Sequence, residues 1–209
     1  MTTFRNGKLQ LFLGLCCAAM ACSPGLASAF SVDSVFATNG TTGIADDFGD
    51  GVLDPAWTVL SGSPTEAGGF LRIADGDSVL RSTGPLSPGA VILAEFDLTE
   101  LSPGEFGGLM VTGSDASDVF TVNFTTAGIF VADETGLLGG VAGAPGAAAS
   151  VQLLAVGTDA ILTVNGSPVY AGTSGLSAFV TGAGFFLVPE PASAVLALLG
   201  LFVVRPRRG

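Results

Sequence analysis

Alternating apolar and polar positions recur along the middle of the chain and predict β-strands. From Ile92 to Leu98 every second side chain is apolar, and acids take two of the positions between them. The same period of two runs from Phe120 to Phe124, which is the spacing that puts one set of side chains on one face of a strand. Runs of strand length with this or a continuous apolar pattern are Phe70–Ile73, Ser78–Ser82, Val91–Leu98, Leu109–Thr112, Val119–Phe124, Ile129–Ala132, Val151–Val156, Ile161–Val164, Val169–Ala171 and Phe179–Leu187.

Turn-forming residues separate these runs and indicate a single all-β domain. Asn165-Gly166 lies between two runs and predicts a tight hairpin, because both residue types tolerate positive φ. The stretch Gly136–Ala149 is low in complexity and predicts a flexible loop. No part of the middle region carries a convincing apolar stripe of helical period. About ten short strands in one domain predict a β-sandwich or barrel.

The first 29 residues have the three parts of a secretory signal peptide. A basic start is followed by the apolar run Leu9–Cys22, and Ala27 and Ala29 flank a small-residue cleavage site. This pattern predicts export through the Sec translocon and a mature chain that begins at Phe30. An alternative is a lipoprotein cysteine at Cys22.

The last 22 residues form a second unusual segment. The apolar, uncharged run Ala192–Val204 would cover about 20 Å as a helix, which is short for a membrane core of about 30 Å. Three arginines follow it and predict a cytoplasmic end, namely Arg205, Arg207 and Arg208. We therefore expect a short membrane helix. The alternative is a buried strand or helix of the globular domain.

A proline-bracketed acid stands directly before this run, and the motif is Val188, Pro189, Glu190 and Pro191. The motif, the apolar run and the arginines, in this order at the C-terminus, resemble the PEP-CTERM sorting signal of Gram-negative bacteria that make exopolysaccharide. The resemblance covers about a tenth of the chain. It implies recognition by an exosortase-type transpeptidase, removal of the tail after an inner-membrane intermediate, and delivery to the cell surface or extracellular matrix.

Composition narrows the chemistry that the middle region can perform. The chain has no histidine, its three cysteines lie in the first 22 residues, and its one lysine is Lys8. These absences exclude histidine-dependent triads, Schiff-base chemistry and the usual zinc sites. Residues 30–188 hold 17 acids and two arginines, a net charge of −15. Such a charge is unsuited to nucleic acid, which is bound through lysine and arginine.

The middle region also resembles concanavalin A-like lectin and glucanase jelly rolls. The resemblance rests on the segments Asp46–Trp57, Gly69–Ile73 and Leu162–Tyr170. The implied fold is an all-β jelly-roll β-sandwich over residues 30–187, between the signal peptide (1–29) and the sorting segment (188–209). Proteins of this fold bind carbohydrate, hydrolyse it or serve as inert modules, so the fold does not decide the function.

One acidic motif is similar to that of retaining β-glucanases. Glu95, Asp97 and Glu100 have the spacing E-x-D-x-x-E, which by resemblance would make Glu95 the nucleophile and Glu100 the acid/base. Glu100 would join the other two on one face only if a bulge lies at Leu98–Thr99. The tryptophan-rich segment that usually precedes the motif is missing. We expect these acids to lie on a solvated strand face.

Two further sets of residues are candidates for binding. Four acids fall within nine residues and could supply oxygen ligands to Ca²⁺, namely Asp46, Asp47, Asp50 and Asp54. Turn-forming aspartates at a strand entrance are the alternative, and we expect no cofactor. Trp57 and Tyr170 are the only large rings suited to sugar stacking in the middle region.

Taken together, the sequence predicts an exported, exosortase-processed surface or matrix protein without catalysis, associated with exopolysaccharide. The first alternative is a lectin-like module with Trp57 and Tyr170 at the sugar. The second is a retaining β-glucan hydrolase that uses Glu95 and Glu100.

Overall fold

The computed structural model describes residues 28–115, 118–176 and 179–188, and the polypeptide in these ranges is all-β. Fifteen strands are present: β1 (Ala29–Thr38), β2 (Gly43–Asp46), β3 (Trp57–Ser61), β4 (Thr65–Ala67), β5 (Phe70–Ala74), β6 (Ser78–Leu86), β7 (Gly89–Asp97), β8 (Phe106–Thr112), β9 (Val119–Thr125), β10 (Gly128–Asp133), β11 (Gly136–Ala142), β12 (Ala148–Val156), β13 (Asp159–Val164), β14 (Ser167–Thr173) and β15 (Val180–Val188). In these ranges no helix is both long and apolar enough to cross a membrane.

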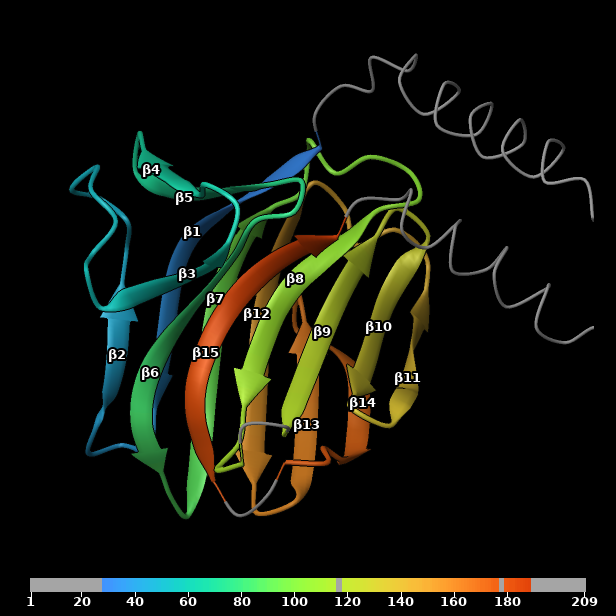
Figure 1. The fold of residues 1–209 in the computed structure, drawn as a ribbon. Helices are drawn as coiled ribbons and strands as arrows, with labels where there is room; N and C mark the ends of the chain where they lie inside the picture. Colours follow the sequence, from blue (N-terminus) through green and yellow to red (C-terminus); the bar gives the residue numbers. More distant parts are fainter. Residues whose placement is uncertain (1–27, 116–117, 177–178, 189–209) are drawn as a thin grey trace, which may run out of the picture.

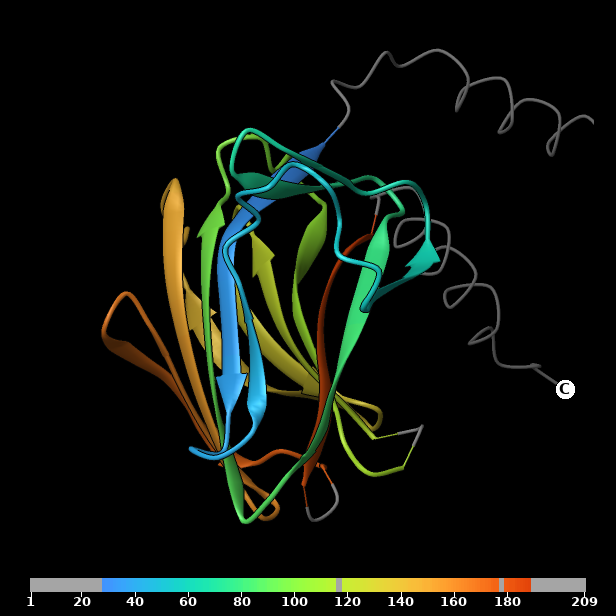
Figure 2. The same ribbon diagram turned by 90° about the vertical axis from the view of Figure 1, so that its left-hand side faces the viewer.

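The strands form two antiparallel sheets that pack face to face as a jelly-roll β-sandwich (Figure 1). We call the eight-stranded sheet, in the order β14-β13-β12-β7-β1-β5-β4 with β2 beside β1, sheet A. Sheet B has seven strands in the order β11-β10-β9-β8-β15-β6-β3. Figure 2 shows the two layers from the side on which β1 and β2 lie. The expected fold class is therefore confirmed.

Strand β1 has two neighbours on the same side because two short segments share its edge. Its first residues pair with β5, with Val32 opposite Leu71, whereas its last residues pair with β2, with Phe36 opposite Ala45. A register shift between Val32 and Ser34 interrupts its pairing with β7 on the other side. The segment between β2 and β3 therefore leaves the sheet at this edge and can fold over its outer face.

The core lies between the sheets and contains a continuous group of aromatic rings. Phe96 of β7 packs against Phe30, Phe124 and Phe185 at centroid distances of 5.1–5.8 Å. Trp57 continues the group, at 5.7 Å from Phe185. Aromatic pairs at this separation in tilted or edge-to-face arrangements add to the free energy of burial.

All ten predicted strands are present, and both alternating runs have the predicted faces. Ile92, Ala94 and Phe96 are buried, and Glu95 and Asp97 are exposed. The predicted hairpin at Asn165-Gly166 joins β13 to β14, and both residues have positive φ, 52° and 73°.

The prediction of a flexible loop over Gly136–Ala149 was wrong for its first half. Gly136–Ala142 is strand β11, which pairs with β10 at the edge of sheet B. Glycine suits two positions of this edge strand, because Gly136 and Gly140 have φ values of 134° and 152°, which other residues rarely adopt. A Cβ at Gly140 would also meet the backbone of Phe130 in β10. The glycines that suggested a loop thus allow the backbone of β11 to approach and pair with β10.

Candidate functional site

An open groove of about 740 Å³ lies on the outer face of sheet A, where β1, β2 and β7 run side by side. Its floor includes Phe36 of β1 and Leu93 of β7, which are directly paired and remain 43% and 39% exposed. The segment between β2 and β3, together with Glu66 of β4, forms one wall. Glu95 of β7 lies on the other side. We call this cavity the β1–β7 groove.

Burial of Phe48 holds the wall against the core. Phe48 is fully buried and has a φ of 48°, which an L-residue adopts only when its surroundings compensate for the strain. Its ring packs on Trp57 at a centroid distance of 5.8 Å. The side chain of Asp46 accepts a hydrogen bond from the Phe48 amide at 3.0 Å, which stabilises this turn.

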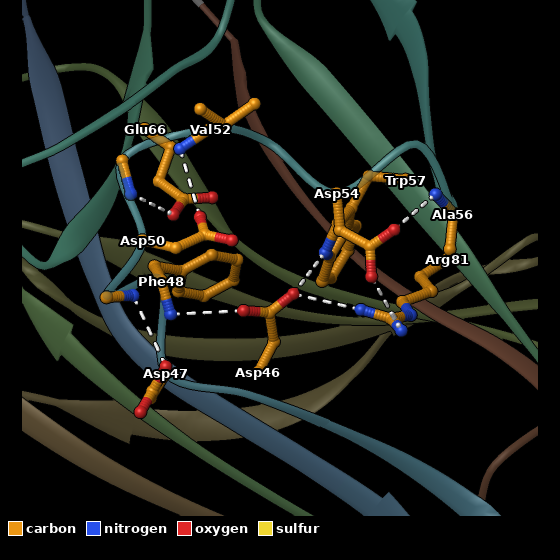
Figure 3. A network of polar contacts seen from close by, with 12 residues as sticks. Asp46, Asp47, Phe48, Asp50, Val52, Asp54, Ala56, Trp57, Glu66 and Arg81 are labelled. Atoms are coloured by element: carbon orange, nitrogen blue, oxygen red, sulfur yellow. Dashed lines mark hydrogen bonds and ion pairs between the residues drawn. The ribbon is translucent and has the colours of Figure 1, made fainter.

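Asp46 joins the wall to strands β3 and β6 (Figure 3). Its Oδ2 accepts hydrogen bonds from Trp57 Nε1 at 2.8 Å and from Arg81 Nη1 at 2.9 Å. The other end of the Arg81 guanidinium pairs with Asp54 at 3.1 Å, and its Cζ lies 5.8 Å from the centroid of the Trp57 ring. Both Asp46 oxygens are therefore used within the protein.

The other three aspartates of the predicted calcium segment stabilise turns. Asp47, Asp50 and Asp54 each accept a hydrogen bond from a main-chain amide two residues further on, at 2.8–3.2 Å. This is the local bonding expected of aspartate in turns. In the described part of the chain, no three acidic, cysteine or histidine side chains form a group suited to a metal ion. The geometry thus agrees with the turn alternative.

Glu66 and Asp50 form a carboxyl pair inside the same wall (Figure 3). Glu66 is 8% exposed and accepts a hydrogen bond from the Gly51 amide at 3.0 Å. Burial raises its pKa, and so do the hydrogen bond and the charge of Asp50, while the Gly51 amide opposes them. The protonated form of Glu66 is therefore favoured relative to a carboxyl group in water.

A polar row crosses the sheet beside the apolar floor. Ser34 of β1 is opposite Glu95 of β7, and Glu95 is opposite Ser150 of β12, whose hydroxyl donates to Glu95 at 2.7 Å. Asp47 follows Asp46, which is opposite Val35, so it extends this row on the other side of Ser34. Two exposed acids therefore flank Ser34, at a separation on the order of 10 Å for two strand spacings.

The glucanase-like motif is divided between two places. Strand β7 ends at Asp97, whose side chain accepts a hydrogen bond from the Thr99 amide at 2.9 Å and turns the chain away. Glu100 then pairs with Arg72 of β5 at 2.6 Å. Asp97 and Glu100 line a smaller cavity of about 130 Å³, whereas Glu95 lines the β1–β7 groove. The strand bulge that would have placed the three acids on one face is not present, because β7 has already ended.

Asp33 also faces the smaller cavity and was not singled out by the sequence. Its partial burial raises its pKa, and the neighbouring charges of Asp97 and Glu95 raise it further. Asp33 could not be placed from the sequence, because the bulge in β1 adds one residue and breaks the alternation from which a strand is predicted.

Trp57 and Tyr170 do not form a sugar-binding pair. Trp57 is 4% exposed and belongs to the core, so its ring faces have no room for a ligand. Tyr170 is half-buried near the opposite edge of the sandwich, where its hydroxyl donates to the Thr173 carbonyl at 2.6 Å. The proposed glycan contact through Trp57 is therefore wrong.

The apolar floor was missed for the same reason as Asp33. Phe36 belongs to β1, which was not predicted, and Leu93 lies in a predicted strand but was not singled out. Leu93 lies two residues before Glu95, so the alternation places it on the solvent-facing side of the strand. A leucine at such a position is the signal that could have identified the apolar floor.

Several predicted residues lie outside the described ranges. These are Ala27 of the cleavage site, the sorting-motif residues Pro189, Glu190 and Pro191, and the basic residues Arg205, Arg207 and Arg208. Two neighbouring residues are described: Ala29 begins β1, and Val188 ends β15, opposite Phe106 of β8.

Comparison with known proteins places the chain in no family. No protein-family model matches it, and no curated protein sequence matches it. Among solved structures, it is similar to the apo Crh5 transglycosylase, with 10% identity over 74% of this chain and 72% of that chain and a TM-score of 0.44. It is also similar to the carbohydrate-binding module CBM66 from Bacillus subtilis, with 12% identity over 64% of this chain and 92% of that chain and a TM-score of 0.34.

Proposed function

We propose that this protein is an exported surface or matrix protein that binds exopolysaccharide through the β1–β7 groove, without catalysis. The observation that carries the proposal is the groove itself. It combines an open apolar floor at Phe36 and Leu93 with a border of hydrogen-bonding side chains. Sugar rings have apolar faces and polar edges, so a site of this composition suits them.

A binding role fits the acids better than a hydrolytic one. A retaining hydrolase needs one carboxyl group that is protonated and one that is ionised, about 5–5.5 Å apart. Arg72 contacts Glu100 at 2.6 Å, so this carboxylate is engaged in an ion pair within the protein. Glu95 lines a different cavity from Glu100.

The binding role is tested with a matched pair of leucine variants. Leu93→Ala removes floor from the groove, whereas Leu60→Ala changes a leucine of β3 that is 52% exposed and does not line it. Calorimetry with matrix polysaccharide from the native cells should show about tenfold weaker binding for Leu93→Ala, because the ligand loses apolar contact with the exposed part of the side chain, worth roughly 1–2 kcal/mol. Leu60→Ala should bind as the unmodified protein does. Equal binding by both variants would contradict the assignment of the groove.

The sorting proposal rests on the C-terminal motif and has its own test. We expect the intact mass of protein from the medium or surface fraction of native cells to begin near Phe30 and end near Val188. Changing Pro189 and Pro191 to Ala should leave unprocessed protein in the inner membrane. A surface protein that retains Ala192–Gly209 would refute exosortase processing and leave the groove unaffected.

A further inference from the structure

The electrostatic character of the β1–β7 groove indicates which class of polysaccharide it accepts. Six of its lining residues are acids and, within the described ranges, none is a lysine or arginine. Arg81 neutralises two of these acids from behind, at Asp46 and Asp54. Among the described residues, the other four acids have no cationic partner, and two of these, Asp50 and Glu66, contact each other.

Asp47 and Glu95 are the two acids that remain available to a ligand. Each is exposed, and each uses one oxygen inside the protein, toward the Gly49 amide and the Ser150 hydroxyl respectively. Among the described residues, the second carboxylate oxygen of each makes no hydrogen bond or ion pair. They stand on either side of Ser34, next to the row formed by Ala45, Phe36 and Leu93. A ligand lying on this apolar floor would therefore meet a carboxylate at each border.

Resting on the proposed function, we propose that the groove binds an amino-sugar polysaccharide with free amino groups, whose ammonium groups pair with Asp47 and Glu95. The sugar rings cover Phe36 and Leu93, and each ammonium group donates charge-assisted hydrogen bonds to a carboxylate. A polymer of uronic acids would meet the four acids that Arg81 does not neutralise, so its binding is opposed. A neutral polymer would gain the apolar contact and lack the ion pairs.

The test compares three short oligosaccharides of equal length with the full-length protein. We use oligomers of glucosamine, of N-acetylglucosamine and of galacturonic acid, and measure dissociation constants by calorimetry at about 0.15 M salt, where the Debye length is about 8 Å. The glucosamine oligomer should bind about tenfold more tightly than the acetylated one, and the galacturonic acid oligomer should not bind.

Variants distinguish binding at the groove from non-specific electrostatic attraction between a cationic oligomer and an acidic protein. Glu95→Gln and Asp47→Asn should each weaken glucosamine binding about fivefold, since an exposed ion pair is worth up to about 1 kcal/mol. Glu134→Gln removes the same charge from the exposed turn between β10 and β11 and should leave binding unchanged. If Glu134→Gln weakens binding as much as Glu95→Gln does, the attraction is non-specific and the ion-pair assignment fails.

The remaining outcomes distinguish this inference from the function on which it rests. Equal binding of the glucosamine and N-acetylglucosamine oligomers, sensitive to Leu93→Ala, would overturn the amino-sugar selectivity and retain carbohydrate binding. Preferred binding of the galacturonic acid oligomer would also overturn it. Failure of all three oligomers and of the native polysaccharide to bind would remove both proposals.

Discussion

Two neighbouring aspartates show how strongly the role of a residue depends on its direction. Asp46 points inward from the end of β2 and accepts hydrogen bonds from Phe48, Trp57 and Arg81. Asp47 points outward and accepts one, from Gly49. The sequence places both in one acidic segment, and only the strand phase separates a structural residue from one available to a ligand.

We therefore expect Asp46→Ala to destabilise the fold by roughly 2–4 kcal/mol, because it leaves the Trp57 indole without a partner and the Arg81 guanidinium with Asp54 alone. Asp47→Ala should cost about 1 kcal/mol or less. Urea unfolding followed by the fluorescence of Trp57 measures both, since this single tryptophan lies in the core. Equal midpoints for the two variants would contradict the network in Figure 3.

The raised pKa of Glu66 predicts a pH-dependent stability. Its pKa is higher in the folded state than in the unfolded chain, so the folded protein binds more protons and the contribution is fully present below the unfolded value. The contribution is lost as pH rises through the folded pKa. Glu66→Gln retains an acceptor for the Gly51 amide but cannot titrate. Between acid and neutral pH, its free energy of unfolding should therefore fall less than that of the unmodified protein. An unchanged profile from pH 4 to pH 8 would disprove the prediction.

At the scale of elements, regular alternation was predictable and interrupted alternation was not. Strands β7 and β9 keep an unbroken period of two, and their faces were predicted correctly. The bulge after Val32 hid β1, and with it Phe36 of the groove. Strands β2 and β4 have only four and three residues, too few to show a period. The groove depends on β1 and β2, so the sequence singled out five of its six acids, all but Glu66, without predicting their arrangement.

The β13–β14 hairpin provides an element-scale test. Asn165 has a φ of 52°, and its side chain accepts from the Ser150 amide at 2.8 Å and donates to the Ala148 carbonyl at 3.2 Å. Asn165→Ala should cost roughly 2 kcal/mol, from the strained φ and the lost bonds to β12. Gly166→Ala is the control, because nothing lies near its Cβ position and only the positive φ opposes it, at about 1 kcal/mol. A larger loss of stability for Gly166→Ala would show that the turn conformation contributes more than the hydrogen bonds from Asn165 to β12.

At the scale of the whole molecule, the charge of −15 in residues 30–188 opposes compaction. Raising NaCl from about 10 mM to about 150 mM shortens the Debye length from about 30 Å to about 8 Å and should increase the urea midpoint. Choline chloride at the same ionic strength should act equally. Calcium chloride should add no more than magnesium chloride does, and a selective effect of micromolar calcium would establish a calcium site.

The burial of Ser28 at the start of the sandwich bears on where a signal peptidase would cleave, if the chain is exported as proposed. Its hydroxyl donates to the Glu100 carbonyl and accepts from the Ser102 amide at 3.0 Å, and the Ala29 amide donates to the same carbonyl. Signal-peptidase cleavage after Ala29 would discard these contacts, whereas cleavage after Ala27 would retain them, and Gly25 and Ala27 also satisfy the small-residue rule. Under the proposed export, we therefore expect Ser28 as the first residue of the mature chain, and N-terminal sequencing of protein from the surface or medium fraction distinguishes the two peptidase products.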